Sequence, residues 1–127
     1  MSKKILIVDD EPHIRLLLEQ TIEEFADNGV EILTSGNGAE ALEIIKRERP
    51  VMVYLDASIP GMSGYDVCNT VKNDLKLKNV YIVMLTARGQ EFDKQRGLLV
   101  GADVYMTKPF NPDTIIEKTS EVLGIKL

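Results

Sequence analysis

The chain has 127 residues, of which 44% are hydrophobic and 28% charged, and its formal net charge is -5. A chain of this size can bury a hydrophobic core without disulfide bonds or structural metal ions, so we expect one domain over residues 1–127. The acidic balance argues against direct binding to nucleic acid, no apolar run approaches the ~20 residues of a membrane span, and the single cysteine, Cys68, is typical of a reducing cytosol.

Five short apolar segments predict β-strands. Four of them are continuous runs rich in β-branched residues, which is typical of strands covered on both faces of a parallel sheet. The segment at 30–34 alternates more between apolar and polar residues. In chain order the predicted strands are residues 5–8, 30–34, 51–55, 80–85 and 104–106.

Helical periodicity fills the segments between these strands. The first helix is expected from Pro12, a residue tolerated in the first turn, to Phe25, with apolar side chains along one face. Asn37 and Glu40 resemble a capping box at the start of the second helix. The other three helices are predicted from Gly64 to about Asn73 behind the cap Ser63, over residues 92–100, and from the cap Asn111 onward.

This order of elements predicts an α/β fold of the (βα)5 type. Because β–α–β connections are right-handed, the helices should cover both faces of a doubly wound, five-stranded parallel sheet. In such sheets, ligands bind beyond the carboxyl ends of the strands, near the point where the strand order reverses. We therefore look for chemistry at that edge.

Polar side chains follow four of the predicted strands. Asp9 and Asp10 follow the first, Asp56 the third, Thr86 the fourth and Lys108 the fifth. Taken singly, each has a simpler explanation. The acid pair could complement the positive end of the first helix, and Asp56 could be a solvated loop residue. Thr86 could bond to nearby backbone, and Lys108 could lie at a surface turn. Together, three acids facing one lysine leave a formal charge of -2, which a divalent cation would neutralise. Oxygen donors favour Mg²⁺ over zinc.

A carboxylate held at the end of a strand, beside a cation and an ammonium, is a candidate nucleophile. Asp56 fits this description, and phosphoryl transfer depends mainly on the positioning and electrostatic stabilisation that such a site supplies. A phosphorylated Asp56 would bring the edge to about -4 before the cation and the lysine are counted. We therefore expect strict dependence on a divalent cation. The only histidine, His13, is expected to be a solvated surface residue.

Four motifs occur in a fixed order along nearly the whole chain. They are "ILIVDDEP", "YLDASIPGMSG", "MLTA" and "GADVYMTKPF". They resemble the acidic pair, the phosphoacceptor loop, the switch and the lysine motif of the receiver domain of two-component response regulators, the CheY-like family. The resemblance implies the flavodoxin-like strand order 2-1-3-4-5, and a signalling phosphoacceptor in a phosphorelay rather than a turnover enzyme.

The resemblance also implies a phosphorylation and metal site. Asp56 would be the phosphorylated aspartate. Asp10 and Asp56 would bind Mg²⁺ through their side chains, Ser58 through its backbone carbonyl, and Asp9 mainly through a metal-bound water. The phosphoryl donor would be a histidine kinase or a histidine phosphotransfer protein in the cytoplasm, with small phosphodonors as substitutes.

For the switch, the resemblance implies that Thr86 and Lys108 hold phosphoryl oxygens, and that Tyr105 turns inward on activation. The peptide bond between Lys108 and Pro109 would be cis. The output surface would be formed by the helix at 92–100, the fifth strand and the last helix, where a downstream effector protein, and possible phosphorylation-dependent homodimers, would dock.

Two residues near these motifs occupy positions that vary in the family. Arg88, two residues beyond Thr86, is expected to influence the lifetime of the phosphorylated state. Leu99 stands where the family often has an acid, and either packs in the core or adds an apolar spot to the docking surface.

Three other classes of protein remain as alternatives. A Mg²⁺-dependent phosphatase with an aspartyl nucleophile, of the haloacid dehalogenase type, would need a D-x-D motif after the first strand and a cap domain. A flavodoxin-like cofactor binder would need a phosphate loop rich in glycine and hydroxyl groups. A receiver-like module that takes no phosphate would act by interaction alone. The start at "MSKK" and the end at "LGIKL" favour a free-standing regulator over a receiver excised from a longer protein.

Overall fold

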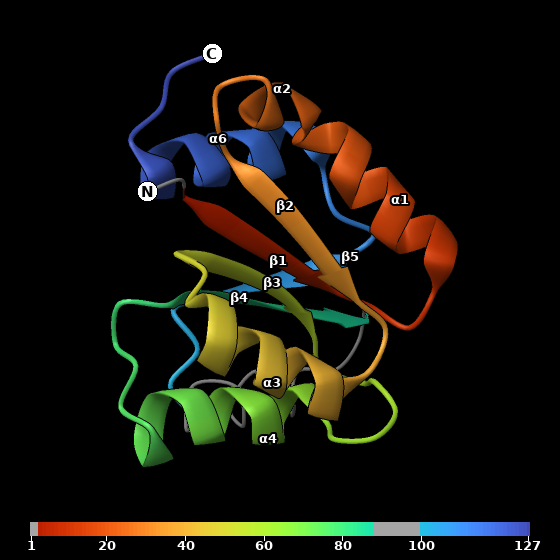
Figure 1. The fold of residues 1–127 in the computed structure, drawn as a ribbon. Coiled ribbons are helices and arrows are strands. Elements are labelled where there is room, and N and C mark those ends of the chain that lie inside the picture. Colours follow the sequence, from red (N-terminus) through yellow and green to blue (C-terminus); the bar gives the residue numbers. More distant parts are fainter. Residues whose placement is uncertain (1–2, 88–99) are drawn as a thin grey trace.

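The computed structural model describes residues 3–87 and 100–127, and its centre is a parallel sheet (Figure 1). The strands are β1 Lys4–Val8, β2 Glu31–Ser35, β3 Met52–Asp56, β4 Tyr81–Ala87 and β5 Val104–Lys108. They lie in the order β2-β1-β3-β4-β5, and each neighbouring pair is parallel. The predicted fold class and strand order are confirmed.

Helices cover both faces of this sheet. They are α1 Pro12–Thr21, α2 Glu23–Ala26, α3 Gly38–Glu48, α4 Gly64–Asn69, the π-helix η1 Thr70–Asp74 and α6 Pro112–Leu123. Figure 1 shows α1, α2 and α6 on one face and α3 and α4 on the other. Within the described part of the chain, no helix is both long and apolar enough to cross a bilayer. The helix expected at 92–100 lies, except for its last residue, outside the described residues.

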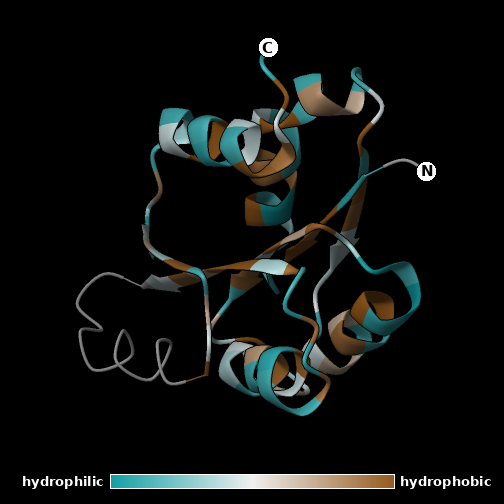
Figure 2. Cartoon of the chain, turned by 90° about the vertical axis from the view of Figure 1, so that its left-hand side faces the viewer, coloured by the Kyte–Doolittle hydropathy of each residue, from teal (hydrophilic) through white to brown (hydrophobic). Residues whose placement is uncertain are grey.

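The core consists of two apolar clusters, one on each face of the sheet. Successive residues of β1 alternate between them: Leu6 and Val8 pack with α3 and α4, and Ile5 and Ile7 pack with α1 and α6. Figure 2 shows the hydrophobic strands running between the two helix layers. This arrangement explains why the strand sequences are continuously apolar, since both faces of each central strand are covered.

Two of the predicted helices are interrupted. The first divides at the fully buried Ile22, whose φ of -107° and ψ of 13° are not helical, so that α1 and α2 are separate. In the third, the α-helix ends at Asn69 and the chain continues as the π-helix η1. There, Leu75 N donates to Thr70 O at 2.8 Å. In both places the apolar pattern continues across the change, because periodicity reports the buried face rather than the backbone angles.

The predicted helix caps are present. The side chains of Asn37, Ser63 and Asn111 each accept hydrogen bonds from amides in the first turn of their helices. The capping box at Asn37 is modified, because the carboxylate of Glu40 accepts from the Ser35 hydroxyl at 2.7 Å, and that hydroxyl in turn accepts from the Asn37 amide. Ser35 thereby ties the end of β2 to the start of α3.

A second tie fixes the start of β5 against β4. The amide of Asp103 donates to Ile82 O at 3.0 Å, and the Asp103 carboxylate accepts from Ile82 N at 2.8 Å. The same carboxylate lies 2.7 Å from the ammonium of Lys72, which extends from η1 and is 8% exposed. These contacts set the register in which β5 pairs with β4, and therefore how far Lys108 extends along the edge.

Candidate functional site

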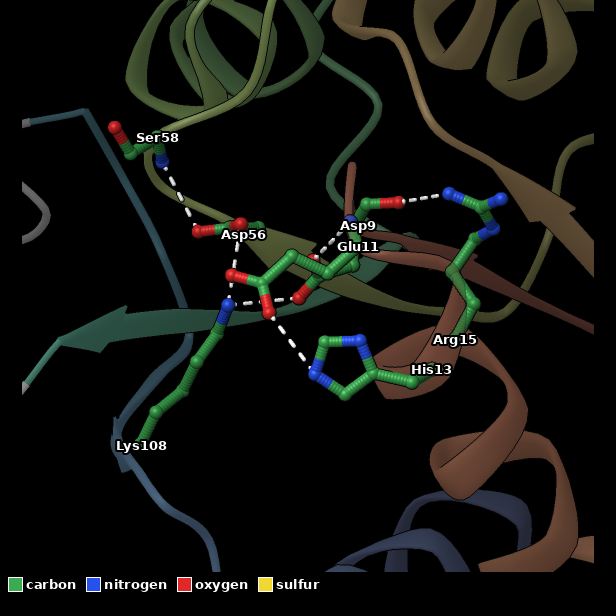
Figure 3. Close-up of polar contacts among 7 residues, drawn as sticks. All are labelled: Asp9, Glu11, His13, Arg15, Asp56, Ser58 and Lys108. Atoms are coloured by element: carbon green, nitrogen blue, oxygen red, sulfur yellow. Dashed lines mark hydrogen bonds and ion pairs between the residues drawn. The ribbon is translucent and has the colours of Figure 1, made fainter.

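A pocket of about 290 Å³ lies at the carboxyl edge of the sheet. Figure 3 shows polar side chains of this edge close together. Its lining comes from the ends of β3, β4 and β5 and from the loops that follow β1 and β3. The lining residues are Asp10, Glu11, Asp56, Ala57, Ser58, Thr86 and Lys108. Five of the residues singled out from the sequence therefore share one pocket, and Asp9 lies directly beside them.

Asp56 is the last residue of β3 and is only 5% exposed. Its Oδ1 accepts a hydrogen bond from Ser58 N at 3.1 Å, and its Oδ2 lies 3.1 Å from Lys108 Nζ. The start of α4 presses against this strand end, since a Cβ on Gly64 would lie 2.2 Å from the Asp56 carbonyl oxygen. The acid is thus held between a backbone amide and an ammonium on a rigid support.

Asp9 is fully buried behind the pocket. Its Oδ2 lies 2.7 Å from Lys108 Nζ, and its Oδ1 accepts from Glu11 N at 3.0 Å. Lys108, at the end of β5, therefore bridges one carboxylate at the end of β3 and another directly after β1 (Figure 3).

Burial and neighbouring charges change the pKa values of Asp56 and Lys108. Burial raises the pKa of Asp56, and the nearby charge of Asp9 adds to this, although the Ser58 amide and Lys108 act in the opposite direction. Burial alone would lower the pKa of Lys108, but the hydrogen bond to Asp9 and the charge of Asp56 outweigh it, so that the pKa of Lys108 is raised. Lys108 is therefore a cation at neutral pH, and the Asp56 carboxylate is held against an electrostatic penalty.

The loop after β1 carries a cluster of three acids. Carboxylate oxygens of Asp9, Asp10 and Glu11 all lie within 4.8 Å of one another, and Asp10 and Glu11 are exposed. Together with Asp56 and Ser58 they offer only hard oxygen donors around an open pocket, a donor set that suits Mg²⁺ and not zinc. On this ground the residues fit a divalent cation.

Glu11 was not among the residues picked from the sequence. A signal was present, because Glu11 directly follows the acidic pair and stands at the N-cap position of α1. Its carboxylate also lies 3.2 Å from Nε2 of His13, whose side chain is 75% exposed, as expected of a surface histidine.

The predicted switch residues lie on neighbouring strands. Thr86 on β4 is 2% exposed and lines the pocket, and Tyr105 on β5 packs, half-buried, against the apolar cluster beneath α3 and α4. The peptide bond between Lys108 and Pro109 is cis, as expected. Arg88 and Leu99 lie outside the described residues.

Curated relatives are similar along almost the whole chain. The alkaline phosphatase synthesis transcriptional regulatory protein PhoP of Bacillus subtilis is 40% identical over 123 residues, which are 97% of this chain and 49% of that protein. The phosphate regulon transcriptional regulatory protein PhoB of Pseudomonas aeruginosa is 39% identical, over 97% of this chain and 52% of that protein. The chain spans about half the length of these relatives.

Solved structures agree with the fold. A putative response regulator from Chloroflexus aurantiacus has a TM-score of 0.85 and 31% identity, covering 98% of this chain and 99% of its own. The chemotaxis response regulator CheY4 of Vibrio cholerae has a TM-score of 0.82 and 33% identity, covering 96% of this chain and 99% of its own. The sequence profile of the response regulator receiver domain matches residues 5–120. With the strand order and the pocket above, this match shows that the chain belongs to the response regulator receiver domain family.

Proposed function

We propose that this chain accepts a phosphoryl group on Asp56 from a histidine kinase or a histidine phosphotransfer protein in the cytoplasm. One observation carries the proposal: the Asp56 carboxylate lines an open pocket at a strand end, with the Lys108 ammonium 3.1 Å away. Family membership supports the same conclusion, since receiver domains are the phosphoacceptors of two-component systems.

In the transfer step, an oxygen of Asp56 forms a bond to phosphorus as the bond between phosphorus and the donor nitrogen breaks, and the donor keeps that electron pair. Lys108 would stabilise the negative charge on the transferring oxygens, and Thr86 would offer its hydroxyl to one of them. The Ser58 amide keeps the carboxylate oriented for attack. The reaction thus requires these groups to be in place before the donor arrives.

Magnesium would be held by the side chains of Asp10 and Asp56 and by the Ser58 carbonyl, with Asp9 behind them. When bound, it supplies positive charge that offsets the acids and the phosphoryl oxygens. The chain's own contribution is to hold these oxygens at one edge despite their mutual repulsion, using the Asp9–Lys108–Asp56 bridge.

The signal would leave through a shift between two states. Phosphorylation adds charge at Asp56 and gives the Thr86 hydroxyl a new acceptor, and Tyr105, on the adjacent strand, would follow Thr86 inward. The surface that changes would comprise residues 92–100, β5 and α6. A downstream effector, or a second phosphorylated copy, would read this surface.

The test is intact mass after incubation with acetyl phosphate and magnesium. We expect wild type to gain one phosphoryl group, and this gain to disappear in Asp56→Asn and in the presence of EDTA. Asp66→Asn, which neutralises an exposed acid in the neighbouring helix α4, is the matched control and should still be modified. A wild type that stays unmodified, or an Asp56→Asn variant that is still modified, would contradict the proposal. Sustained turnover of a phosphomonoester would instead support the phosphatase alternative.

A further inference from the structure

The side chain of Arg15 reaches back from α1 to the backbone of the acidic loop. Its Nη1 donates a hydrogen bond to the carbonyl oxygen of Asp9 at 2.5 Å (Figure 3). That carbonyl belongs to the peptide that joins Asp9 to Asp10. We propose that Arg15 is a positioning residue that fixes this peptide and thereby prearranges the acidic loop for a divalent cation, an inference that rests on the proposed function.

The rest of Asp9 is already held by other elements. Its amide donates to Ser35 O at 3.1 Å, and its carboxylate contacts Lys108 and the amide of Glu11. The bond from Arg15 restrains the carbonyl side, from which the chain leads to Asp10. Because Asp10 is exposed and lines the pocket, the orientation of this peptide decides where its carboxylate points.

A second element is shaped around the same bond. Gly36, in the loop between β2 and α3, faces the guanidinium: a Cβ there would lie 2.8 Å from Arg15 Nη1 and 3.5 Å from Asp9 O. A methyl group at this position would therefore push the guanidinium away from the carbonyl. Two residues from different parts of the chain, Arg15 and Gly36, can thus be changed independently to disturb one hydrogen bond.

Charge and positioning predict opposite effects on cation binding. Arg15 is itself a cation near the acids, so its removal should strengthen binding of Mg²⁺ if charge alone mattered. Mg²⁺ demands near-octahedral ligands, and loss of an outer partner that orients them typically weakens binding by about 10- to 100-fold. The sign of the change therefore identifies the role.

The experiment measures magnesium affinity of the full chain by isothermal titration calorimetry. We expect Arg15→Met to bind Mg²⁺ about tenfold more weakly. Arg15→Lys, which keeps the charge and one donor, should recover part of the affinity, and Gly36→Ala should weaken it. Arg47→Met removes the same charge from a side chain that is 65% exposed on α3, and should change the affinity by less than about twofold.

Hydrogen exchange without magnesium gives a readout that depends on neither the metal nor phosphorylation. The Asp9 amide, which donates to Ser35 O, and the Glu11 amide, which donates to the Asp9 carboxylate, should exchange faster in Arg15→Met than in wild type or Arg47→Met. If Arg15→Met does not fold, Arg15→Lys and Gly36→Ala carry both measurements.

The inference is overturned if wild type binds no magnesium, if Arg15→Met binds it as tightly as wild type or more tightly, or if exchange is unchanged. Failure of the proposed function is a separate result: Asp56 stays unmodified although magnesium binding depends on Arg15 as expected. Modification of Asp56 together with unchanged affinity in Arg15→Met would remove the positioning role alone.

Discussion

Tyr54 and Asp56 stand two residues apart on β3, and both carry polar atoms into buried surroundings. The Tyr54 hydroxyl lies 2.6 Å from the Thr119 hydroxyl, which donates to Ile115 O at 2.7 Å, so neutral partners satisfy it. Asp56 instead shares a single ammonium with the buried Asp9. The interior pair connects β3 to α6 without net charge, whereas Lys108 and the two carboxylates that it bridges keep one negative charge in excess. Stability accounts for the first arrangement, and the function proposed above would account for the second.

The largest test of this contrast is Lys108→Met. Loss of the ammonium leaves two carboxylates facing each other in partly dry surroundings, and we expect a loss of roughly 2–3 kcal/mol in unfolding free energy at neutral pH. Urea unfolding without magnesium measures it. Lys118→Met is the matched control, since that lysine is 22% exposed against 20% for Lys108 but pairs with an exposed acid. Equal losses of unfolding free energy in the two variants would mean that Lys108 does not offset a repulsion between Asp9 and Asp56.

Tyr54→Phe should have a smaller effect. Removing the hydroxyl deletes its buried hydrogen bonding to the Thr119 hydroxyl and to Ile115 O. The Thr119 hydroxyl stays bonded to Ile115 O, so we expect a loss of about 1 kcal/mol in unfolding free energy. The double variant with Thr119→Val should lose less than the sum of the two single variants, because it removes both partners. A full double-mutant cycle by urea unfolding checks this, and strictly additive losses would show that the two hydroxyls do not stabilise each other.

Asp56→Asn should have the smallest effect, and in the opposite direction. Because burial raises the pKa of Asp56 above its ordinary 3.8, the native state binds this proton more tightly than the unfolded chain does. The stability that the protonated acid contributes is present at low pH and lost as the pH rises through the native pKa. Without magnesium, Asp56→Asn should therefore have a higher unfolding free energy than wild type at neutral pH, and a smaller advantage in acid.

Urea unfolding at a series of pH values checks this third prediction. The advantage of Asp56→Asn over wild type should grow as the pH rises from the acid range. An advantage that stays constant, or shrinks, with rising pH would show that the Asp56 carboxylate is not held against a penalty. Added magnesium should favour wild type over Asp56→Asn, if the carboxylate is a ligand.

Much of the fold follows from local sequence. Continuous apolar runs located the strands, because a central parallel strand is covered on both faces, and Asn37, Ser63 and Asn111 marked helix starts, because their side chains satisfy amides that no helix bond reaches. The break at Ile22 and the π-helix η1 could not be predicted from the sequence pattern. Neither interrupts the apolar pattern, so a pattern that reports burial does not record them.

For the site, the order of strands was enough to bring Asp10, Asp56 and Lys108 to one pocket. The sequence did not indicate which acid the lysine would contact most closely, and Asp9 proved nearer than Asp56. That choice depends on side-chain burial and on distances between residues far apart in the chain. The bond from Arg15 to the Asp9 carbonyl has the same origin, since no residue spacing encodes it.

The tie between Asp103, Ile82 and Lys72 has an evolutionary consequence. Contacts at these three positions help to fix the register of β5, so substitutions that preserve them should preserve the placement of Lys108. Exposed positions that do not touch these contacts are then free to diverge while the ammonium stays in register. A lineage could therefore vary its surface without rebuilding the edge that carries Asp56 and Lys108.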